Sequence, residues 1–507
     1  MRACGILMPV FSLPSPYGIG TFGREAYAFV DFLKKAGQSY WQILPLNPTN
    51  YGDSPYQSFS SAAGNPYFID LDRLAEEGLL RREEYASVDF GDDPGRVDYG
   101  KLYAHRLPVL RRAFERFCPT EDYRQFCVAQ ADWLEEYALF MALKDAHGGV
   151  RWREWEPALR LREPEALADA QVRYAGDADF YRFLQYEFYR QWGALKRYAN
   201  RSGIRIIGDM PIYVADDSAD VWAHTDQFDL DEELLPRVVA GCPPDAFSEE
   251  GQLWGMPVYR FDRMEREPSP FSWWVRRVRH ALAVYDVVRI DHFRGFEAFY
   301  CIPYGAVNAK RGVWRPGPGM KLFDALEREL GPELPIIAED LGLLTPGVQK
   351  LLQDSGFPGM KVLQFAFDPK GESDYLPHRC IRHCVMYTGT HDNDTVVGWT
   401  RSADPREVEY ARRYLHVDPQ EGFHWAMIRA VLASVADTAI CMMPDFMGLS
   451  SEARINTPST LGDNWQWRID GGCLNDWLAG IIRENVALYG RLPQEETGEE
   501  SEESADR

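Results

Sequence analysis

Short apolar runs that end in a polar or acidic residue recur along the chain, separated by stretches with helical periodicity. Each run has the length and apolar content of a buried β-strand, and the stretch after it indicates an α-helix. The eight runs are CGILMPVF from Cys4, SYWQILPL from Ser39, IRIIGDM from Ile204, DVVRIDHF from Asp286, PIIAEDL from Pro335, MKVLQFAF from Met360, CVMYTGTHD from Cys384 and TAICMMPDF from Thr438. Eight such units predict an α/β fold, a closed (β/α)8 TIM barrel.

The helical stretches carry apolar residues every three or four positions, which predicts one buried face on each helix. Residues 180–199 show this spacing, and Gly203 then ends the helix just before the third run. Residues 23–36 show the same pattern before the second run. Residues 475–489 predict a closing helix after the eighth run.

The chain is much longer than a barrel requires, since a bare barrel takes ~250 residues and this sequence has 507. We therefore predict large, mostly helical insertions on the barrel loops. One covers about 65–200, between the second and third strands, and another covers about 212–270, after the third strand. The prediction is a single catalytic barrel over 1–493, with no room for a C-terminal β-sandwich domain.

Composition and charge narrow the class of protein. With 45% apolar and 26% charged residues, the chain has the composition of a globular protein. Its formal net charge of −22 opposes nucleic-acid binding, because a polyanion is bound mainly through basic side chains. No run approaches ~18 apolar residues, so we expect no membrane span. Residues 494–507, rich in Glu and Asp, predict a disordered acidic tail.

The cysteines and the N-terminal segment indicate a cellular compartment. The nine cysteines are scattered without the spacing of a disulfide framework. Prolines interrupt the short apolar run at the N-terminus, so no secretion signal is recognisable. We expect a cytoplasmic protein with reduced thiols, and we leave its oligomeric state open.

Two segments suggest a bound metal or cofactor, and neither completes its motif. Cys380, His383 and Cys384 lack a second ligand pair at zinc spacing, so packed thiols are the better interpretation. The segment GIGTFG from Gly18 matches a dinucleotide motif. The second run, however, closes as LNP from Leu46, without the acid that binds ribose. We expect no metal and no cofactor, and the glycines serve loop and helix-start geometry.

Acidic residues follow five of the predicted strands. The active site of a barrel enzyme lies at the carboxyl ends of its strands, so these acids are the first candidates for catalysis. They are Asp209, Asp291, Glu339, Asp392 and Asp445. A single acid after a strand is often only a helix cap. A helix-capping role is the better interpretation for Asp445. For Asp209 a capping role and a functional role are equally good interpretations.

The fourth and fifth runs place two of these acids next to each other. Because side chains alternate along a strand, Arg289 and Asp291 share a face, and we expect the guanidinium to lower the pKa of Asp291. Glu339 follows the next strand, ~4.8 Å away. This spacing fits the ~5–5.5 Å carboxyl separation of a retaining glycosidase, in which Asp291 is the nucleophile and raises the pKa of the acid, Glu339. The alternative is a purely structural Arg–Asp pair.

The seventh run ends in TGTHDNDT, which places His391 and Asp392 in the following loop. A carboxylate here would hydrogen-bond sugar hydroxyls and stabilise the positive charge of an oxocarbenium-like transition state. His391 by itself would more often be an ordinary loop histidine.

Taken together, these segments resemble the 4-α-glucanotransferases called amylomaltases or disproportionating enzymes, within the α-amylase superfamily. The resemblance extends from end to end. The motifs that carry it are PSPYGIGTFG, GDSPYQSFSSAAGNP from Gly52, GDMPIYV from Gly208, PPDAFSEEGQLWGMP from Pro243, VRIDHFRG, IIAEDLG, GTHDNDT and GDNWQWR from Gly462.

The resemblance implies that Asp291 is the nucleophile, Glu339 the acid/base and Asp392 the transition-state stabiliser. The residues it implies around the sugar are Arg289, His391, Asp209, Tyr56, Trp254, Gln252, Ser54 and Asn464. Trp254 and Gln252 would belong to a loop that is rich in Pro and Gly and covers the glucan.

The implied reaction moves a segment of an α-1,4-glucan or maltooligosaccharide to the 4-hydroxyl of another glucan or of glucose, by a retaining mechanism. An α-1,4-glucan hydrolase that uses the same carboxylates is the first alternative. A catalytically inactive glucan-binding barrel is the second.

Overall fold

The computed structural model describes residues 2–244, 249–342, 344–371 and 373–494. At its centre is a sheet of eight parallel strands, and every predicted run overlaps one of them. The strands are β1 (Ala3–Leu7), β2 (Tyr40–Gln42), β3 (Arg205–Met210), β6 (Val287–Ile290), β9 (Ile336–Ala338), β10 (Gly359–Val362), β11 (Cys384–Tyr387) and β12 (Thr438–Met442).

The eight strands close on themselves. Hydrogen bonding gives the order β10-β11-β12-β1-β2-β3-β6-β9. The two outer strands then meet, because the N–H of Ala338 on β9 donates to the carbonyl of Pro358, just before β10, at 3.0 Å. The predicted (β/α)8 barrel is confirmed.

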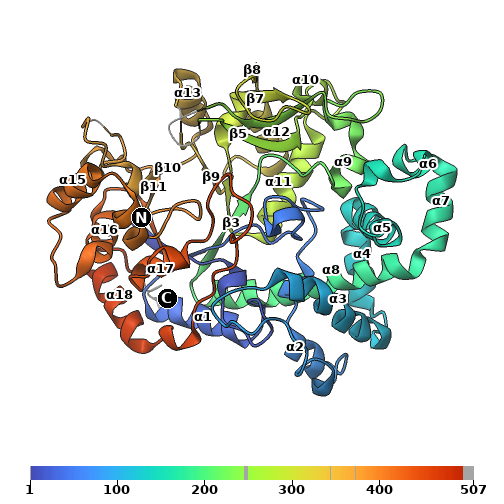
Figure 1. The fold of residues 1–507 in the computed structure, drawn as a ribbon, viewed down its shortest axis with the longest axis horizontal. Helices are drawn as coiled ribbons and strands as arrows, with labels where there is room; N and C mark the ends of the chain where they lie inside the picture. The colour runs from blue at the N-terminus through green and yellow to red at the C-terminus, as the bar shows by residue number, and fades with distance from the viewer. Residues whose placement is uncertain (1, 245–248, 343, 372, 495–507) are drawn as a thin grey trace, which may run out of the picture.

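Helices follow the strands and cover the barrel (Figure 1). They are α1 (Arg24–Lys35), α8 (Ala175–Arg201), α11 (Ser272–Val284), α12 (Met320–Leu330), α13 (Pro346–Ser355), α14 (Val396–Ser402), α15 (Pro405–Leu415), α16 (Gly422–Ala433), α17 (Met443–Phe446) and α18 (Asp476–Leu488). Gly23 is the N-cap of α1, and Gly18 has a φ of 76°. The GIGTFG glycines therefore shape a loop and a helix start.

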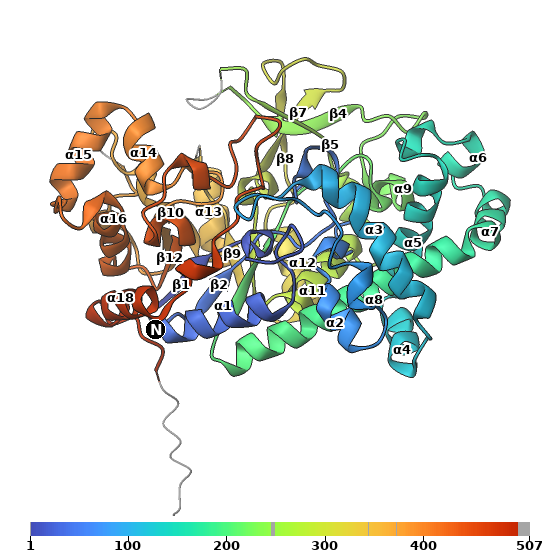
Figure 2. The same ribbon diagram turned by 60° about the horizontal axis from the view of Figure 1, so that its bottom comes forward.

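Further helices fill the long segment between β2 and β3. They are α2 (Leu71–Glu76), α3 (Tyr99–Arg116), α4 (Glu121–Ala129), α5 (Ala131–Ala146), α6 (Pro157–Arg160) and α7 (Pro164–Arg173), followed by α8. Figures 1 and 2 both place α3 to α7 on one side of the barrel. The segment in which we predict a helical insertion is thus built from helices.

A second, antiparallel sheet lies beyond the carboxyl ends of the barrel strands, at the top of Figure 2. Its strands are β4 (Val238–Cys242), β5 (Gln252–Pro257), β7 (Ala298–Pro303) and β8 (Val313–Pro316), in the order β5-β4-β7-β8. Two short helices, α9 (Ala219–Ala223) and α10 (Phe261–Met264), flank this region.

The prediction that Gln252 and Trp254 lie in a loop is therefore wrong, because both belong to β5. The strand is hidden in the sequence by its turn-forming neighbours: Gly251 and Gly255 both have positive φ, and the β4–β5 register is irregular. Such short strands form because their partners complete the sheet, which local pattern does not reveal.

After β12 the described chain ends in α17 and α18, and Arg491 then joins the two chain ends to the barrel. Its buried guanidinium donates to the carbonyls of Leu432 (2.7 Å), Ala436 (2.9 Å) and Ala3 (2.8 Å). Residues 495–507, most of the predicted acidic tail, lie outside the described residues. Of the helices in the described residues, none has the length and apolar content needed to cross a bilayer.

Candidate active site

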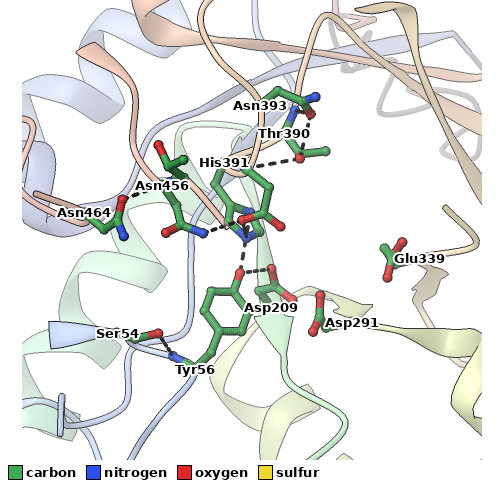
Figure 3. Close-up of polar contacts among 12 residues, drawn as sticks. Ser54, Tyr56, Asp209, Asp291, Glu339, Thr390, His391, Asn393, Asn456 and Asn464 are labelled. Atoms are coloured by element: carbon green, nitrogen blue, oxygen red, sulfur yellow. Dashed lines mark hydrogen bonds and ion pairs between the residues drawn. The ribbon is translucent and has the colours of Figure 1, made fainter. Parts of the chain in front are cut away.

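Three charged side chains from two neighbouring strands form the centre of the candidate site, and Figure 3 shows two of them, Asp209 and Asp291. The β3–β6 register pairs Asp209 with Arg289. Nη1 of Arg289 donates to both carboxylate oxygens of Asp209, at 2.7 and 2.6 Å, and to Oδ1 of Asp291 at 3.0 Å. The Arg289 and Asp209 side chains are almost fully buried, whereas Asp291 is 28% exposed. Asp291 is thus the carboxylate of this trio that a ligand can reach.

Tyr56 joins this cluster to the loop after β11. Its hydroxyl donates to Oδ2 of Asp209 at 2.7 Å, and its ring stacks on that of His391, with centroids 5.1 Å apart. Burial, and then the negative charge of Asp209, raise the pKa of Tyr56 well above its usual value, so the phenol stays protonated. Oγ of Ser54 accepts the Tyr56 N–H at 3.2 Å and shapes the turn that presents the ring.

Glu339 lies beside Asp291 because β6 and β9 are neighbours. The parallel register pairs Ile290 with Ala338, and these two residues immediately precede Asp291 and Glu339. Both acids therefore leave the barrel at the same level, and Figure 3 shows them next to each other.

Backbone donors hold the Glu339 carboxyl from two sides. Oε2 accepts the N–H of His292 at 2.6 Å, and Oε1 accepts the N–H of Leu341 at 2.9 Å. These bonds fix the orientation of the side chain, whether it is ionised or protonated.

Burial raises the pKa of both acids. The pKa of Glu339 rises to about 8, through burial and the charge of Asp291 against the opposing charge of Arg289. The pKa of Asp291 rises to about 6, because burial outweighs the opposing charge of Arg289. The predicted lowering at Asp291 is therefore wrong in its net direction. The predicted order survives, since Asp291 ionises before Glu339 does.

Asp392 is held by a loop that follows β12. Nδ2 of Asn456 donates to Oδ1 of Asp392 at 2.6 Å, and Nη2 of Arg454 donates to its backbone carbonyl at 2.9 Å. Nε2 of His391 lies 3.4 Å from the same Oδ1. The Asp392 side chain remains 44% exposed. It is fixed in orientation and still open to a ligand.

Trp254 reaches the site from β5. Its indole meets the ring of His292 edge-to-face at a centroid distance of 4.8 Å, and Tyr213 lies 6.1 Å away. Its N–H donates to Oε1 of Gln252 at 3.1 Å, and its carbonyl accepts from Nε2 of Gln57 at 3.3 Å. The indole is therefore positioned beside the residue that follows Asp291.

Comparison with known proteins identifies the family of this chain. A sequence model of the 4-α-glucanotransferase family matches residues 8–474. The chain belongs to this family. The 4-α-glucanotransferase of Thermus thermophilus is 52% identical over 97% of this chain and 99% of its own, and that of Clostridium butyricum is 49% identical over 96% and 100%. A solved amylomaltase from Streptococcus agalactiae, in complex with acarbose, superposes with a TM-score of 0.94 at 42% identity, covering 97% of this chain and all of its own.

The comparison confirms the family predicted from the motifs, and with it an enzyme on a (β/α)8 barrel. The structure brings together Asp209, Arg289, Asp291, Glu339 and Tyr56. It also brings His391 and Asp392 from the loop after β11, and Trp254 and Gln252 from β5.

In this member of the 4-α-glucanotransferase family, the hydrogen bonds that the structure gives Asn464 lie within its own loop. Its Oδ1 accepts the N–H of Thr457 at 2.9 Å, and its Nδ2 donates to the carbonyl of Thr460 at 3.2 Å. The next residue, Trp465, packs against Tyr56 and His391, with centroids 5.7 and 6.0 Å away. Asn464 thus shapes the loop that carries Trp465, and a direct contact with sugar stays a prediction.

Asn456 and His292 are the site residues that sequence reasoning missed. His292 stands within the VRIDHFRG motif, next to Asp291, but no spacing argument assigns it a role. Asn456 lies in a polar loop, 64 residues from the carboxylate it contacts. Only the folded chain brings Asn456 to the site and shows the contacts of His292 with Glu339 and Trp254.

Asp445 has the structural role that its sequence context favours. The carboxyl is fully buried, and it accepts from Oγ1 of Thr388 and from the N–H of Val396, both at 2.7 Å. It therefore ties the first turn of α14 to the barrel, and burial raises its pKa to about 7.

The Cys380, His383 and Cys384 cluster does not form a metal site. The two sulfur atoms are 3.2 Å apart, and Nε2 of His383 contacts the carbonyl of Gly356 at 2.8 Å instead of a sulfur. Within the described ranges there is no group of three His, Cys, Asp or Glu side chains arranged to hold a metal ion.

A small cavity lies behind Tyr56 and Asp209, lined further by Tyr189, His280 and Tyr285. Its volume of about 40 Å³ compares with the ~10–15 Å³ that one water molecule needs. It has room for a few water molecules and not for a sugar ring. The exposed sides of Asp291 and Asp392 are the parts of this site that are open to a larger ligand.

Proposed function

We propose that this enzyme breaks an α-1,4-glucan or maltooligosaccharide and passes the donor segment to the 4-hydroxyl of another glucan or of glucose, by two displacements at the same carbon. The observation that carries the proposal is the pair Asp291 and Glu339, at the same level on adjacent strands with pKa values of about 6 and about 8. Strands ~4.8 Å apart can bring two carboxyls to the ~5–5.5 Å separation of a retaining enzyme, which is shorter than the gap an inverting enzyme needs for water. The similarity to an amylomaltase solved with acarbose supports the choice of substrate class.

In the first displacement Glu339 gives its proton to the glycosidic oxygen, while a carboxylate oxygen of Asp291 bonds to the anomeric carbon. The bond to the leaving glucan breaks, and the donor segment is held as an ester of Asp291. Asp392, fixed by Asn456, hydrogen-bonds the sugar hydroxyls and offsets the positive charge of the transition state.

In the second displacement Glu339, now ionised, takes the proton from the acceptor's 4-hydroxyl. The acceptor oxygen bonds to the anomeric carbon, and Asp291 leaves as a carboxylate. Arg289 stays positive throughout, because Asp209 and Asp291 raise its pKa against the effect of burial. Its positive charge stabilises the ionised carboxylate of Asp291 before the ester forms and after the ester breaks.

The pKa order predicts a bell-shaped pH profile for kcat/KM on maltotriose. Activity rises with pH as Asp291 ionises, with an apparent pKa near 6, and falls as Glu339 loses its proton, near 8. Because the two acids interact, these values belong to the pair. Initial rates of transfer between pH 4 and pH 10 measure the profile. A rate that stays constant from pH 7 to pH 10 would contradict the role of Glu339 as the acid.

Trp254 is expected to favour transfer over hydrolysis, since the ester on Asp291 reacts with water or with a sugar hydroxyl. An acceptor stacked on the indole is held for attack and excludes water. The variant Trp254→Ala should therefore raise the ratio of hydrolysis to transfer on maltotriose. The measurement is the gain in free reducing ends against the amount of lengthened chain, at matched substrate concentration.

A suitable control for Trp254→Ala is Trp477→Ala, because Trp477 is 73% exposed on α18, outside the site. It should leave the ratio unchanged. If Trp254→Ala slows both products equally, the indole serves donor binding or local structure and does not protect the ester from water.

Maltotriose distinguishes the proposed function from its two alternatives. Transfer yields glucose together with chains longer than the substrate, whereas a hydrolase yields only shorter sugars. A glucan-binding protein without catalysis leaves maltotriose intact. Separation of the products by length after a timed reaction therefore tests the proposal directly.

A further inference from the structure

His292 stands in the backbone conformation that L-residues rarely adopt, directly after Asp291. Its φ of 52° and ψ of 47° lie in the left-handed region. Non-glycine residues held there are few, and they concentrate where the surrounding structure uses the geometry. His292 lies in the turn between β6 and a short 3-10 helix, Phe293–Phe296, and this turn uses a left-handed histidine where glycine would be less strained.

The left-handed residue points two successive amides toward Glu339. The N–H of His292 donates to Oε2 of Glu339 at 2.6 Å, and the N–H of Phe293 donates to the backbone carbonyl of Glu339 at 3.1 Å. The preceding N–H, that of Asp291, points the other way, to Met210 on β3. In an extended strand, successive amides alternate in direction, whereas the left-handed residue lets both neighbouring N–H groups face Glu339, one at its carboxyl and one at its backbone carbonyl.

The imidazole of His292 anchors this conformation. The ring meets the indole of Trp254 edge-to-face, with centroids 4.8 Å apart and planes at 90°. Its Nε2 is buried and has no hydrogen-bond partner among the described residues. Burial and the charge of Arg294 lower the pKa of the ring to about 3, so the ring is neutral. A neutral ring places no positive charge beside the carboxyl of Glu339.

We propose that His292 is a positioning residue of the transfer reaction, which holds the acid/base Glu339 through its left-handed backbone amide while its ring anchors that backbone on Trp254. This inference rests on the proposed function, because it takes Glu339 as the acid/base. His292 thereby links Trp254 to Glu339, because its ring packs on the indole and its backbone amide binds the carboxyl.

Two substitutions separate the amide from the ring. His292→Gly removes the ring, but glycine adopts positive φ readily and keeps the N–H in place. His292→Val also removes the ring, and a β-branched residue resists positive φ, so the N–H groups of residues 292 and 293 no longer both face Glu339. The two variants therefore differ mainly in the bond to Glu339.

The readout is the ratio of first-step rates on two donors, maltotriose and α-glucosyl fluoride. The first donor needs a proton on its leaving group, and fluoride departs without one. For His292→Val we expect this ratio to fall roughly 10–100-fold, since a misplaced general acid forfeits part of its 10²–10⁴-fold contribution. For His292→Gly we expect a fall of less than roughly fivefold on the same scale.

The matched control is His416→Val. His416 is an exposed histidine that caps α15 in the same left-handed conformation, at φ 50° and ψ 54°. This variant introduces the same backbone strain far from the site, so it should lower the melting temperature and leave the donor ratio unchanged.

Equal donor ratios for His292→Val and His292→Gly would overturn the inference, and so would a loss on both donors alike in His292→Val. Failure of the proposed function is distinguishable, because the wild-type enzyme would then make no chains longer than maltotriose. Melting temperatures of all variants show whether each remains folded during the assay.

Discussion

Asp291→Asn is expected to lower turnover on maltotriose by roughly four orders of magnitude or more, because an amide does not form the glycosyl ester. The substitution preserves the shape of the side chain. Arg289 keeps both of its bonds to Asp209, at 2.7 and 2.6 Å, so the buried guanidinium stays paired. Glucan binding should persist, since the sugar contacts proposed for Asp392 and Trp254 do not involve the Asp291 carboxyl. Steady-state rates and binding by calorimetry measure the two effects separately.

Asp445→Asn is the matched control for this variant. Asp445 is also a buried carboxyl at the end of a barrel strand, and its partners, Thr388 and Val396, flank the loop that carries His391 and Asp392. An amide offers one acceptor oxygen in place of two, so this variant should lose stability and lower the turnover of the folded protein far less than Asp291→Asn does. Near-normal turnover in Asp291→Asn, or its unfolding, would show that Asp291 has a structural role.

The barrel and its chemistry are readable in the sequence because both follow short-range rules. An apolar run that ends in an acid marks a strand end, and parallel strands bring their carboxyl ends together. Asp209, Asp291 and Glu339 become neighbours for this reason alone. The contact of Asp291 with Arg289 follows from side-chain alternation along β6, and that of Asp209 follows from the register between β3 and β6.

The antiparallel sheet is not readable in the same way. Strands β4 and β7 pair although about sixty residues separate them, as in the match of Val238 with Pro303. All four strands are short, and β4 and β5 each contain a glycine, so neither length nor periodicity marks them. The placement of Trp254 on a strand depends on this pairing of distant segments. The sequence alone therefore predicts a loop at this residue.

The direction of the pKa shift at Asp291 also depends on the folded structure. The sequence shows a neighbouring Arg289, which favours the ionised form, but it does not show how far the site is removed from water. Burial adds an opposing effect that is larger, and the pKa of Asp291 rises to about 6. The same burial raises the pKa of Glu339 further, to about 8, so Asp291 still ionises before Glu339, as the proposed mechanism requires.

Glu339→Gln is expected to lower the first-step rate on maltotriose by roughly 10²–10⁴-fold, because glutamine has no proton to give to the leaving glucan. With α-glucosyl fluoride the same step should slow far less, since fluoride leaves without protonation. The amide still accepts from one backbone N–H, but its NH₂ group faces the other of the two donors, His292 or Leu341, and that bond is lost. A modest loss on both donors is therefore expected in addition to the selective loss on maltotriose.

The decisive measurement for Glu339→Gln is the burst of fluoride against the burst of glucose released from maltotriose, both in a single turnover. The ester on Asp291 should accumulate in this variant, because the base that activates the acceptor is also missing. A small anionic nucleophile such as azide, which needs no base, should then release the ester faster than glucose does. Equal losses on the two donors, without any accumulated ester, would contradict the assignment of Glu339 as both acid and base.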